Sequence, residues 1–249
     1  MYKIATPPWN PGLKAANTEL VWQSPLEKEQ FEKMMADPVH RAYFIDKGWD
    51  RPEAITYKIN SLGFRSDEFD DSPCLVALGC SYSFGVGLPI DDTWPALVGK
   101  ALGLKVFNLA WPGQGSDYCF RMANHWISQL NTKYCVLLNP PPSRVEVLME
   151  NGQAETFMPH SLSSYYNPND WFLTQWMVNE DNHWLNNRRN ALAVKQICAE
   201  LGVACNTYEA IEHMSGSREE LEYARDYMHA GPRGHQIFAE RILNDKART

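Results

Sequence analysis

Two distant segments of the chain carry the side chains best suited to covalent chemistry. The first, GCSYSFG from Gly79 to Gly85, places a serine just after a short apolar run and between glycines. Glycine permits a tight turn, so Ser81 would present both its hydroxyl and its own N–H to a ligand. A serine hydroxyl is a weak nucleophile without a base. This segment on its own therefore fits a connecting loop equally well.

The second segment, DYMHAGPRGH, runs from Asp226 to His235 and precedes an amphipathic stretch. Asp226 and His229 lie three residues apart in an expected turn, so both side chains can face one side. The carboxylate could then hold the Nδ1–H of the imidazole and leave Nε2 directed at a serine. The alternative is that Asp226 forms the turn and His229 is a surface residue. His235 is the second candidate for the base, but it lies inside the expected final helix.

Together these segments resemble the conserved blocks of the SGNH (GDSL-like) hydrolase superfamily. The family's first block, GDSxxxG, is matched by GCSYSFG, and its last block, DxxH before a Pro/Gly turn and helix, is matched from Asp226. Its second block resembles NLAWPGQG, from Asn108 to Gly115, with Gly113 the better match for the oxyanion-binding glycine. The three blocks follow the family's order over residues 74–243. The resemblance implies a flavodoxin-like three-layer α/β/α fold with a parallel central sheet.

The resemblance also implies roles for individual residues. Ser81 would be the nucleophile of an ester hydrolysis through an acyl-serine intermediate, with His229 and Asp226 completing the triad. The oxyanion hole would consist of the N–H groups of Ser81 and Gly113 and the amide of Asn139. No cofactor or metal is implied.

The sequence departs from the family pattern in two places. The aspartate of the first block is replaced by Cys80, which we expect to be a buried, unactivated thiol. The third block, usually GxND, is replaced by NPPPSR from Asn139 to Arg144, so the only asparagine at that strand end falls two places early. Asn139 could still reach the site along the path that the prolines set, or it could only cap the strand end.

Three further side chains are candidates for substrate binding: Arg144, Tyr82 and Trp111. Arg144 could bind an anionic group of the substrate, although a structural ion pair is more common. Residues 151–187 form a polar and aromatic segment that suits sugar rings or a lid over the site. The same segment fits a packed cap or a dimer contact equally well.

The elements needed to position these residues follow from short apolar runs alternating with helical spacing. Buried strands are expected at 74–79, 105–109, 134–138 and 203–208, and helices at 92–102, 116–130, 187–201 and 231–243. Such alternation predicts a parallel sheet covered on both faces, with sites at the carboxyl ends of its strands. Residues 1–70 are expected to form an arm that packs on this core, with a helix at 25–36 and a strand within 55–64.

Composition narrows the possible functions of the 249-residue chain. A net charge of -7 without a basic block argues against nucleic acid as a partner. Its six scattered cysteines, without a CxxC pair, predict small buried hydrophobes in a reducing compartment rather than a zinc site. With no apolar span and no signal peptide evident, we expect a cytoplasmic protein. The oligomeric state is left open.

The function expected from the sequence is hydrolysis of a short-chain O-acyl ester, with carbohydrate O-acetyl groups as one such substrate. Two alternatives stay open: a non-catalytic binding module on the same fold, suggested by the missing third block, and an acyltransferase that uses the same triad.

Overall fold

A parallel sheet forms the centre of the protein. The computed structural model describes residues 8–158, 179–214 and 218–248. Within these ranges the sheet has four strands in the order β4-β3-β5-β8, and each adjacent pair is parallel. Its strands are β3 (Cys74–Leu78), β4 (Lys105–Asn108), β5 (Thr132–Asn139) and β8 (Ala204–Glu209). Strand β3, the first of these four along the chain, thus lies between β4 and β5, the second and the third. This is the strand order of flavodoxin-like folds.

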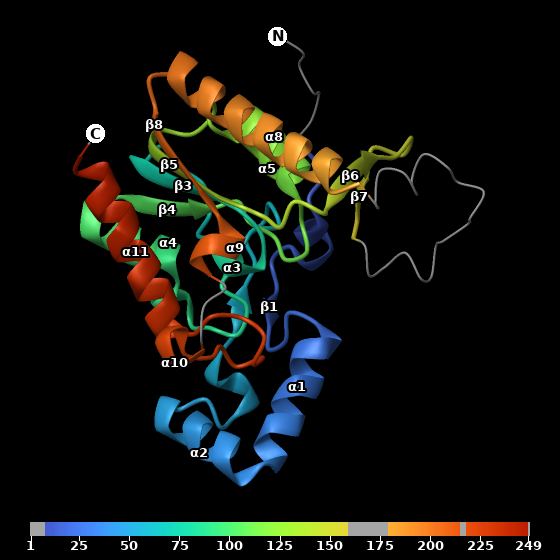
Figure 1. Ribbon diagram of the computed structural model, residues 1–249, viewed down its shortest axis with the longest axis vertical. Helices are drawn as coiled ribbons and strands as arrows, with labels where there is room; N and C mark the ends of the chain where they lie inside the picture. The colour runs from blue at the N-terminus through green and yellow to red at the C-terminus, as the bar shows by residue number, and fades with distance from the viewer. Residues whose placement is uncertain (1–7, 159–178, 215–217, 249) are drawn as a thin grey trace.

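Helices cover both faces of the sheet, which confirms the expected three-layer architecture (Figure 1). The helices α5 (Ser116–Trp126) and α8 (Glu180–Glu200) pack on one face, while α4 (Trp94–Leu102) and α11 (Pro232–Lys246) pack on the other. The side chains of β3 alternate between these two cores: Val76 points to the first and Ala77 to the second. Every residue of β3 is buried, as expected for a strand covered on both sides.

The segment before β3 packs against the edge of this core where the loop after β3 lies. This loop, residues 79–88, contains the candidate nucleophile Ser81 and is called the nucleophile loop. It contains α1 (Pro25–Ala36), α2 (Pro38–Lys47) and a short antiparallel pair, β1 (Glu19–Leu20) with β2 (Tyr57–Lys58). Their apolar side chains share one buried cluster with residues of the loops after β3 and β4. That cluster includes Phe31, Phe44, Trp49, Phe84, Val86, Leu88 and Ala110.

The expected elements are present, and two of them differ most in extent. The expected strand within 55–64 is only the two-residue β2. Helix α8 begins at Glu180, seven residues before the expected start, after Asn179 caps its N-terminus. Its first turns bury asparagines rather than apolar residues, because Asn186 and Asn190 donate hydrogen bonds to Asp117 of α5. Hydrophobic periodicity cannot detect a helix face that packs through amides.

Part of the 151–187 segment belongs to regular elements. A hairpin, β6 (Val145–Leu148) with β7 (Ala154–Phe157), extends into its beginning, and its last eight residues belong to α8. Trp184 lies half-exposed on α8. The aromatic residues Tyr165, Tyr166, Trp171, Phe172 and Trp176 lie outside the described residues.

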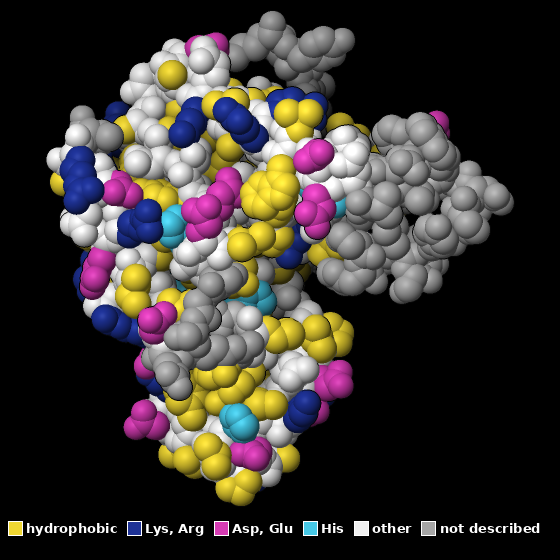
Figure 2. Space-filling view, viewed as in Figure 1, with side chains coloured by type: hydrophobic (Ala, Val, Ile, Leu, Met, Phe, Trp, Pro, Cys, Tyr) yellow, Lys and Arg dark blue, Asp and Glu magenta, His cyan; other side chains and the backbone are white. Residues whose placement is uncertain are grey.

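The remaining helical segments are short turns between the main elements. They are η1 (Pro11–Ala15), η2 (Pro52–Ala54), α3 (Ser81–Phe84), η3 (Ile90–Asp92), α9 (Ala210–His213) and α10 (Arg218–Leu221). Of the helices in the described ranges, none has both the length and the apolar character needed to cross a bilayer. On the face drawn in Figure 2, lysine and arginine side chains lie among those of aspartate and glutamate.

Candidate active site

Ser81 follows the buried end of β3 and opens the one-turn helix α3. Between the strand and the helix lies Gly79, whose φ of 155° is rare for residues with a side chain. A Cβ on Gly79 would lie 2.1 Å from Ser83 Oγ and 2.9 Å from the carbonyl oxygen of Leu138. Glycine is thus required for the turn, and the turn directs Ser81 beyond the carboxyl edge of the sheet.

His229 reaches Ser81 from the loop before α11. Its Nε2 lies 2.7 Å from Ser81 Oγ, and its Nδ1 lies 2.5 Å from Asp226 Oδ2. An ionised carboxylate can only accept, so Nδ1 carries the ring proton and Nε2 is the acceptor for the serine hydroxyl. The structure thus brings Ser81, His229 and Asp226, from two distant segments of the chain, into one hydrogen-bonded series.

The turn that holds Asp226 and His229 is formed by the carboxylate itself. Asp226 Oδ1 accepts the backbone N–H groups of Met228 and His229, both at 3.1 Å. Asp226 is fully buried, whereas the His229 side chain is 17% exposed and Ser81 is 6% exposed. Tyr227, between them, has a φ of 57°. The carboxylate is therefore fixed away from solvent, and only the serine–imidazole end of the series is open to a ligand.

Gly113 lies in the turn after β4, with a φ of 79° and nothing within 4 Å of the position of a Cβ. Among the described residues, no hydrogen bond uses its N–H. The neighbouring Gln114 fixes this turn, because its carbonyl accepts from Arg144 and its side chain accepts from Thr156. Gly113 and the Ser81 N–H follow adjacent parallel strands, β4 and β3, at the same edge of the sheet.

Asn139 ends β5 and is completely buried. Its amide nitrogen donates to Glu209 Oε1 at 3.0 Å, across the pair formed by β5 and β8. Asn187 donates to the other oxygen of Glu209. Burial raises the pKa of Glu209, and the hydrogen bond from Asn139 opposes this rise. The structure therefore places the amide nitrogen of Asn139 against Glu209 of β8.

The three candidate substrate contacts differ in their environment. The ring of Tyr82 lies edge-on to the His229 imidazole, with 5.0 Å between ring centroids. Trp111 packs against the ring of Phe84 and against Gly12, so it joins the nucleophile loop to the N-terminal segment. Within the described ranges Arg144 forms no ion pair, and its hydrogen bond goes to the backbone of the Gly113 turn.

His235, the second candidate for the base, has a different role. It is almost completely buried, and its Nδ1 accepts the backbone N–H of Trp94 at 3.0 Å. Trp94 is the first residue of α4, and the side chain of the cap residue, Thr93, accepts no hydrogen bond from the first turn of the helix. Burial, and then the nearby charges of His229 and Arg65, lower the pKa of His235 to about 3. His235 is thus a neutral cap that joins α11 to α4.

Two buried arginines, Arg65 and Arg225, hold the loops that carry Ser81 and Asp226. The sequence did not indicate either residue as part of the site. Arg65 donates to the carbonyls of Phe84, Gly85 and Leu88 in the nucleophile loop. Arg225, adjacent to Asp226, pairs with Glu27 of α1 at 2.6 Å and donates to three carbonyls of the N-terminal segment. Local patterns did not indicate either residue, because all of these partners are distant in sequence.

Two other side chains, Asn108 and Cys80, lie next to Ser81 or its loop. Asn108, at the end of β4, donates to the carbonyl of Ser83 and accepts from the N–H of Ala110. Asn108 therefore connects the end of β4 to the nucleophile loop by hydrogen bonds. Cys80 is buried, with its sulfur 3.9 Å from Ser81 Oγ.

Comparisons with known proteins gave matches among solved structures alone. No model of a protein family and no curated protein matches the chain. One similar structure is described as a lipolytic protein of the G-D-S-L family from Desulfitobacterium hafniense DCB-2. It has 14% identity, a TM-score of 0.34, and covers 68% of this chain and 96% of its own. A second, TesA, has 14% identity, a TM-score of 0.36, and covers 69% and 96%.

The first of these descriptions names the family that the sequence motifs resemble. The function is inferred from the geometry around Ser81.

Proposed function

We propose that the protein is a serine ester hydrolase of the SGNH type. The observation that carries this proposal is the series Asp226–His229–Ser81, with hydrogen-bond distances of 2.5 and 2.7 Å. A buried carboxylate, an imidazole held in one tautomer and a serine at a strand end are together the requirements for an activated alkoxide nucleophile.

The reaction would begin with attack of Ser81 Oγ on the carbonyl carbon of the ester while His229 Nε2 takes the hydroxyl proton. The resulting imidazolium is stabilised by Asp226, which keeps its negative charge. His229 then returns the proton to the departing alcohol and leaves an acyl-serine. In the second half of the reaction, His229 takes a proton from a water molecule as that water attacks the acyl group. His229 then returns a proton to Ser81 Oγ, and the acid is released.

The negative charge that develops on the carbonyl oxygen needs donors aimed at it. We assign this role to the N–H groups of Ser81 and Gly113, which follow adjacent strands at the same sheet edge. Removing one such donor typically costs about 100- to 1000-fold in kcat. Asn139 is not part of this assignment, because its amide bonds Glu209.

The acyl group we propose is short. Ser81 is only 6% exposed, and the ring of Tyr82 lies against His229, so a small acyl group reaches the hydroxyl most readily. O-acetylated carbohydrates are the first natural substrates to test, with Arg144 and Trp111 as candidate contacts to the alcohol part.

Covalent labelling tests the nucleophile directly. We expect a fluorophosphonate probe to label the wild-type protein and the Ser83→Ala variant, but not Ser81→Ala. Ser83 is a matched control, since it is buried in the same turn and donates only to the carbonyl of Leu78. Folded wild-type protein that neither reacts with the probe nor hydrolyses p-nitrophenyl acetate would refute the proposal.

The two alternatives are affected differently by the site geometry. A non-catalytic binding module would have been favoured by a large distance between His229 and Ser81, and the observed 2.7 Å removes that support. An acyltransferase uses the same triad with an acceptor alcohol in place of water. Product analysis with and without added sugar alcohols separates it from the hydrolase.

A further inference from the structure

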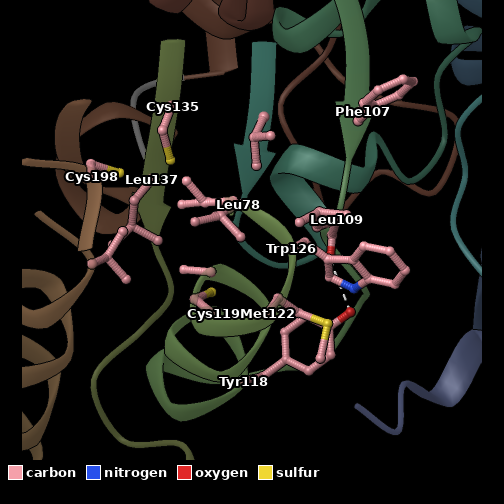
Figure 3. Packing of buried hydrophobic residues seen from close by; sticks show 14 of the residues in the cluster. Leu78, Phe107, Leu109, Tyr118, Cys119, Met122, Trp126, Cys135, Leu137 and Cys198 are labelled. Carbon is pink, nitrogen blue, oxygen red and sulfur yellow. Dashed lines mark hydrogen bonds between the residues drawn. The ribbon is translucent and has the colours of Figure 1, made fainter. Parts of the chain in front are cut away.

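Three cysteines that are far apart in sequence meet on the α5/α8 face of the sheet. Cys135 of β5 and Cys205 of β8 are direct partners across the parallel pair, and Cys198 lies above them near the end of α8. Their three sulfur atoms all lie within 4.8 Å of one another. Figure 3 shows Cys135 and Cys198 with their sulfurs among the buried apolar side chains. We call these residues the three-cysteine cluster.

The cluster has the dimensions of a metal site. A metal bound to thiolate sulfur at about 2.3 Å, in a flat three-coordinate arrangement, requires sulfurs about 4.0 Å apart. Cys135 and Cys198 are buried, and Cys205 is half-buried at the edge strand β8, which leaves one side for entry. In the described residues, no histidine or carboxylate joins the three sulfurs as a fourth ligand.

We propose that the three-cysteine cluster binds one Cu(I) ion as a three-coordinate thiolate site. Structural zinc sites are almost always four-coordinate, and only three ligands converge here within an apolar core. Soft thiolates select Cu(I), which accepts three sulfur ligands. The site is separate from the triad, because Cys135 lies four residues before Asn139, about 13 Å along β5 from the carboxyl edge.

Titration of reduced protein with Cu(I) under nitrogen, in competition with bathocuproine disulfonate, tests the proposal. We expect one equivalent of Cu(I) to be retained by the wild-type protein, with sulfur-to-copper charge-transfer absorption. Cys198→Ala should weaken retention at least 100-fold. Cys74→Ala is the matched control: Cys74 is buried on the same face of the sheet but outside the cluster, and its variant should bind like the wild type.

Iodoacetamide labelling of the wild-type protein gives a second measurement that does not depend on a variant folding. Cu(I) should suppress modification of Cys205, the half-buried member, as mapped by mass spectrometry. The proposal is overturned if bathocuproine disulfonate removes all copper from folded protein, if Cys198→Ala retains it, or if Cys74→Ala loses it equally. Uptake of zinc but not Cu(I), or a disulfide within the cluster in place of copper, would also overturn it.

Discussion

At the scale of single residues, the candidate site depends on groups whose protonation is set by their neighbours. His229 has one nitrogen bonded to a buried carboxylate, which leaves the other as the acceptor for Ser81. His235, six residues later, accepts the N–H of Trp94 and caps α4. The two histidines thus differ in role because a ring nitrogen of His229 faces a carboxylate, whereas a ring nitrogen of His235 faces a helix terminus.

Asp226→Asn tests the tautomer argument. An amide nitrogen facing Nδ1 would reverse the ring protonation, so we expect kcat to fall by about 10⁴-fold with little change in KM. Steady-state hydrolysis of p-nitrophenyl acetate measures this, with Asp91→Asn, an exposed carboxylate before α4, as the control. A loss smaller than tenfold in folded protein would argue against the proposed role of Asp226.

Protonation of His235 should make the fold sensitive to acid. Its pKa in the folded protein is about 3, lowered chiefly by burial from an ordinary value of 6.5. Below pH 6.5, His235 therefore binds a proton in the unfolded chain but stays neutral in the folded protein. This contribution to stability is complete above pH 6.5 and falls by about 1.4 kcal/mol per pH unit toward pH 3.

The variant His235→Asn keeps an acceptor near Trp94 but does not titrate. Urea unfolding between pH 7 and pH 4 should show a shallower loss of stability for this variant than for the wild type. Equal slopes would contradict the inferred burial of a neutral imidazole.

At the scale of elements, helix α1 and the loop before α11 are joined by one ion pair. Glu27 and Arg225 are both almost completely buried, and Glu27 also accepts from the hydroxyl of Tyr57. That hydroxyl accepts in turn from the N–H of Gly87, whose carbonyl accepts from the N–H of Arg225. The backbone next to Asp226 is thus positioned by residues nearly 200 positions away.

Loss of the Glu27 carboxylate should leave the Arg225 charge buried without its partner. We expect Glu27→Ala to lower the free energy of unfolding by about 3–5 kcal/mol. Glu32→Ala, on the same helix, should change it little, because its pair with Lys28 is exposed. Chemical denaturation of both variants measures the difference, and comparable effects would contradict the role assigned to the buried pair.

At the scale of the whole molecule, the N-terminal segment forms part of the structure that supports the site. Arg65 holds the nucleophile loop through three carbonyls, and Arg225 is held in turn by the carbonyls of Val21, Pro52 and Ile55. Both the Ser81 loop and the loop that carries Asp226 therefore rely on residues that precede the sheet.

A fragment of residues 71–249 should therefore fail to form the active site. It would expose the apolar cluster around Phe84 and leave the guanidinium of Arg225 without its partners. We expect non-cooperative urea unfolding, binding of a hydrophobic dye and no fluorophosphonate labelling at Ser81. A fragment that unfolds cooperatively and is labelled like the full chain would contradict this dependence.

The sequence by itself determined the features that depend on neighbouring residues. Short apolar runs predicted the strands, the glycine at the end of the first run predicted the turn at Gly79, and the spacing of Asp226 and His229 predicted a turn that presents both side chains. These features are readable because local sterics and the alternation of buried side chains act over a few residues. The alternation of strands and helices along the chain predicted a parallel sheet covered on both faces.

Only the tertiary structure decided which partners the buried polar groups find. The amide of Asn139 was compatible with two positions until β8 placed Glu209 beside it. The start of α8 was hidden because its buried face consists of asparagines bonded to Asp117. The three-cysteine cluster likewise has no local spacing. In each case the deciding contact joins residues far apart in the chain, so it exists only once the sheet and its helices have packed.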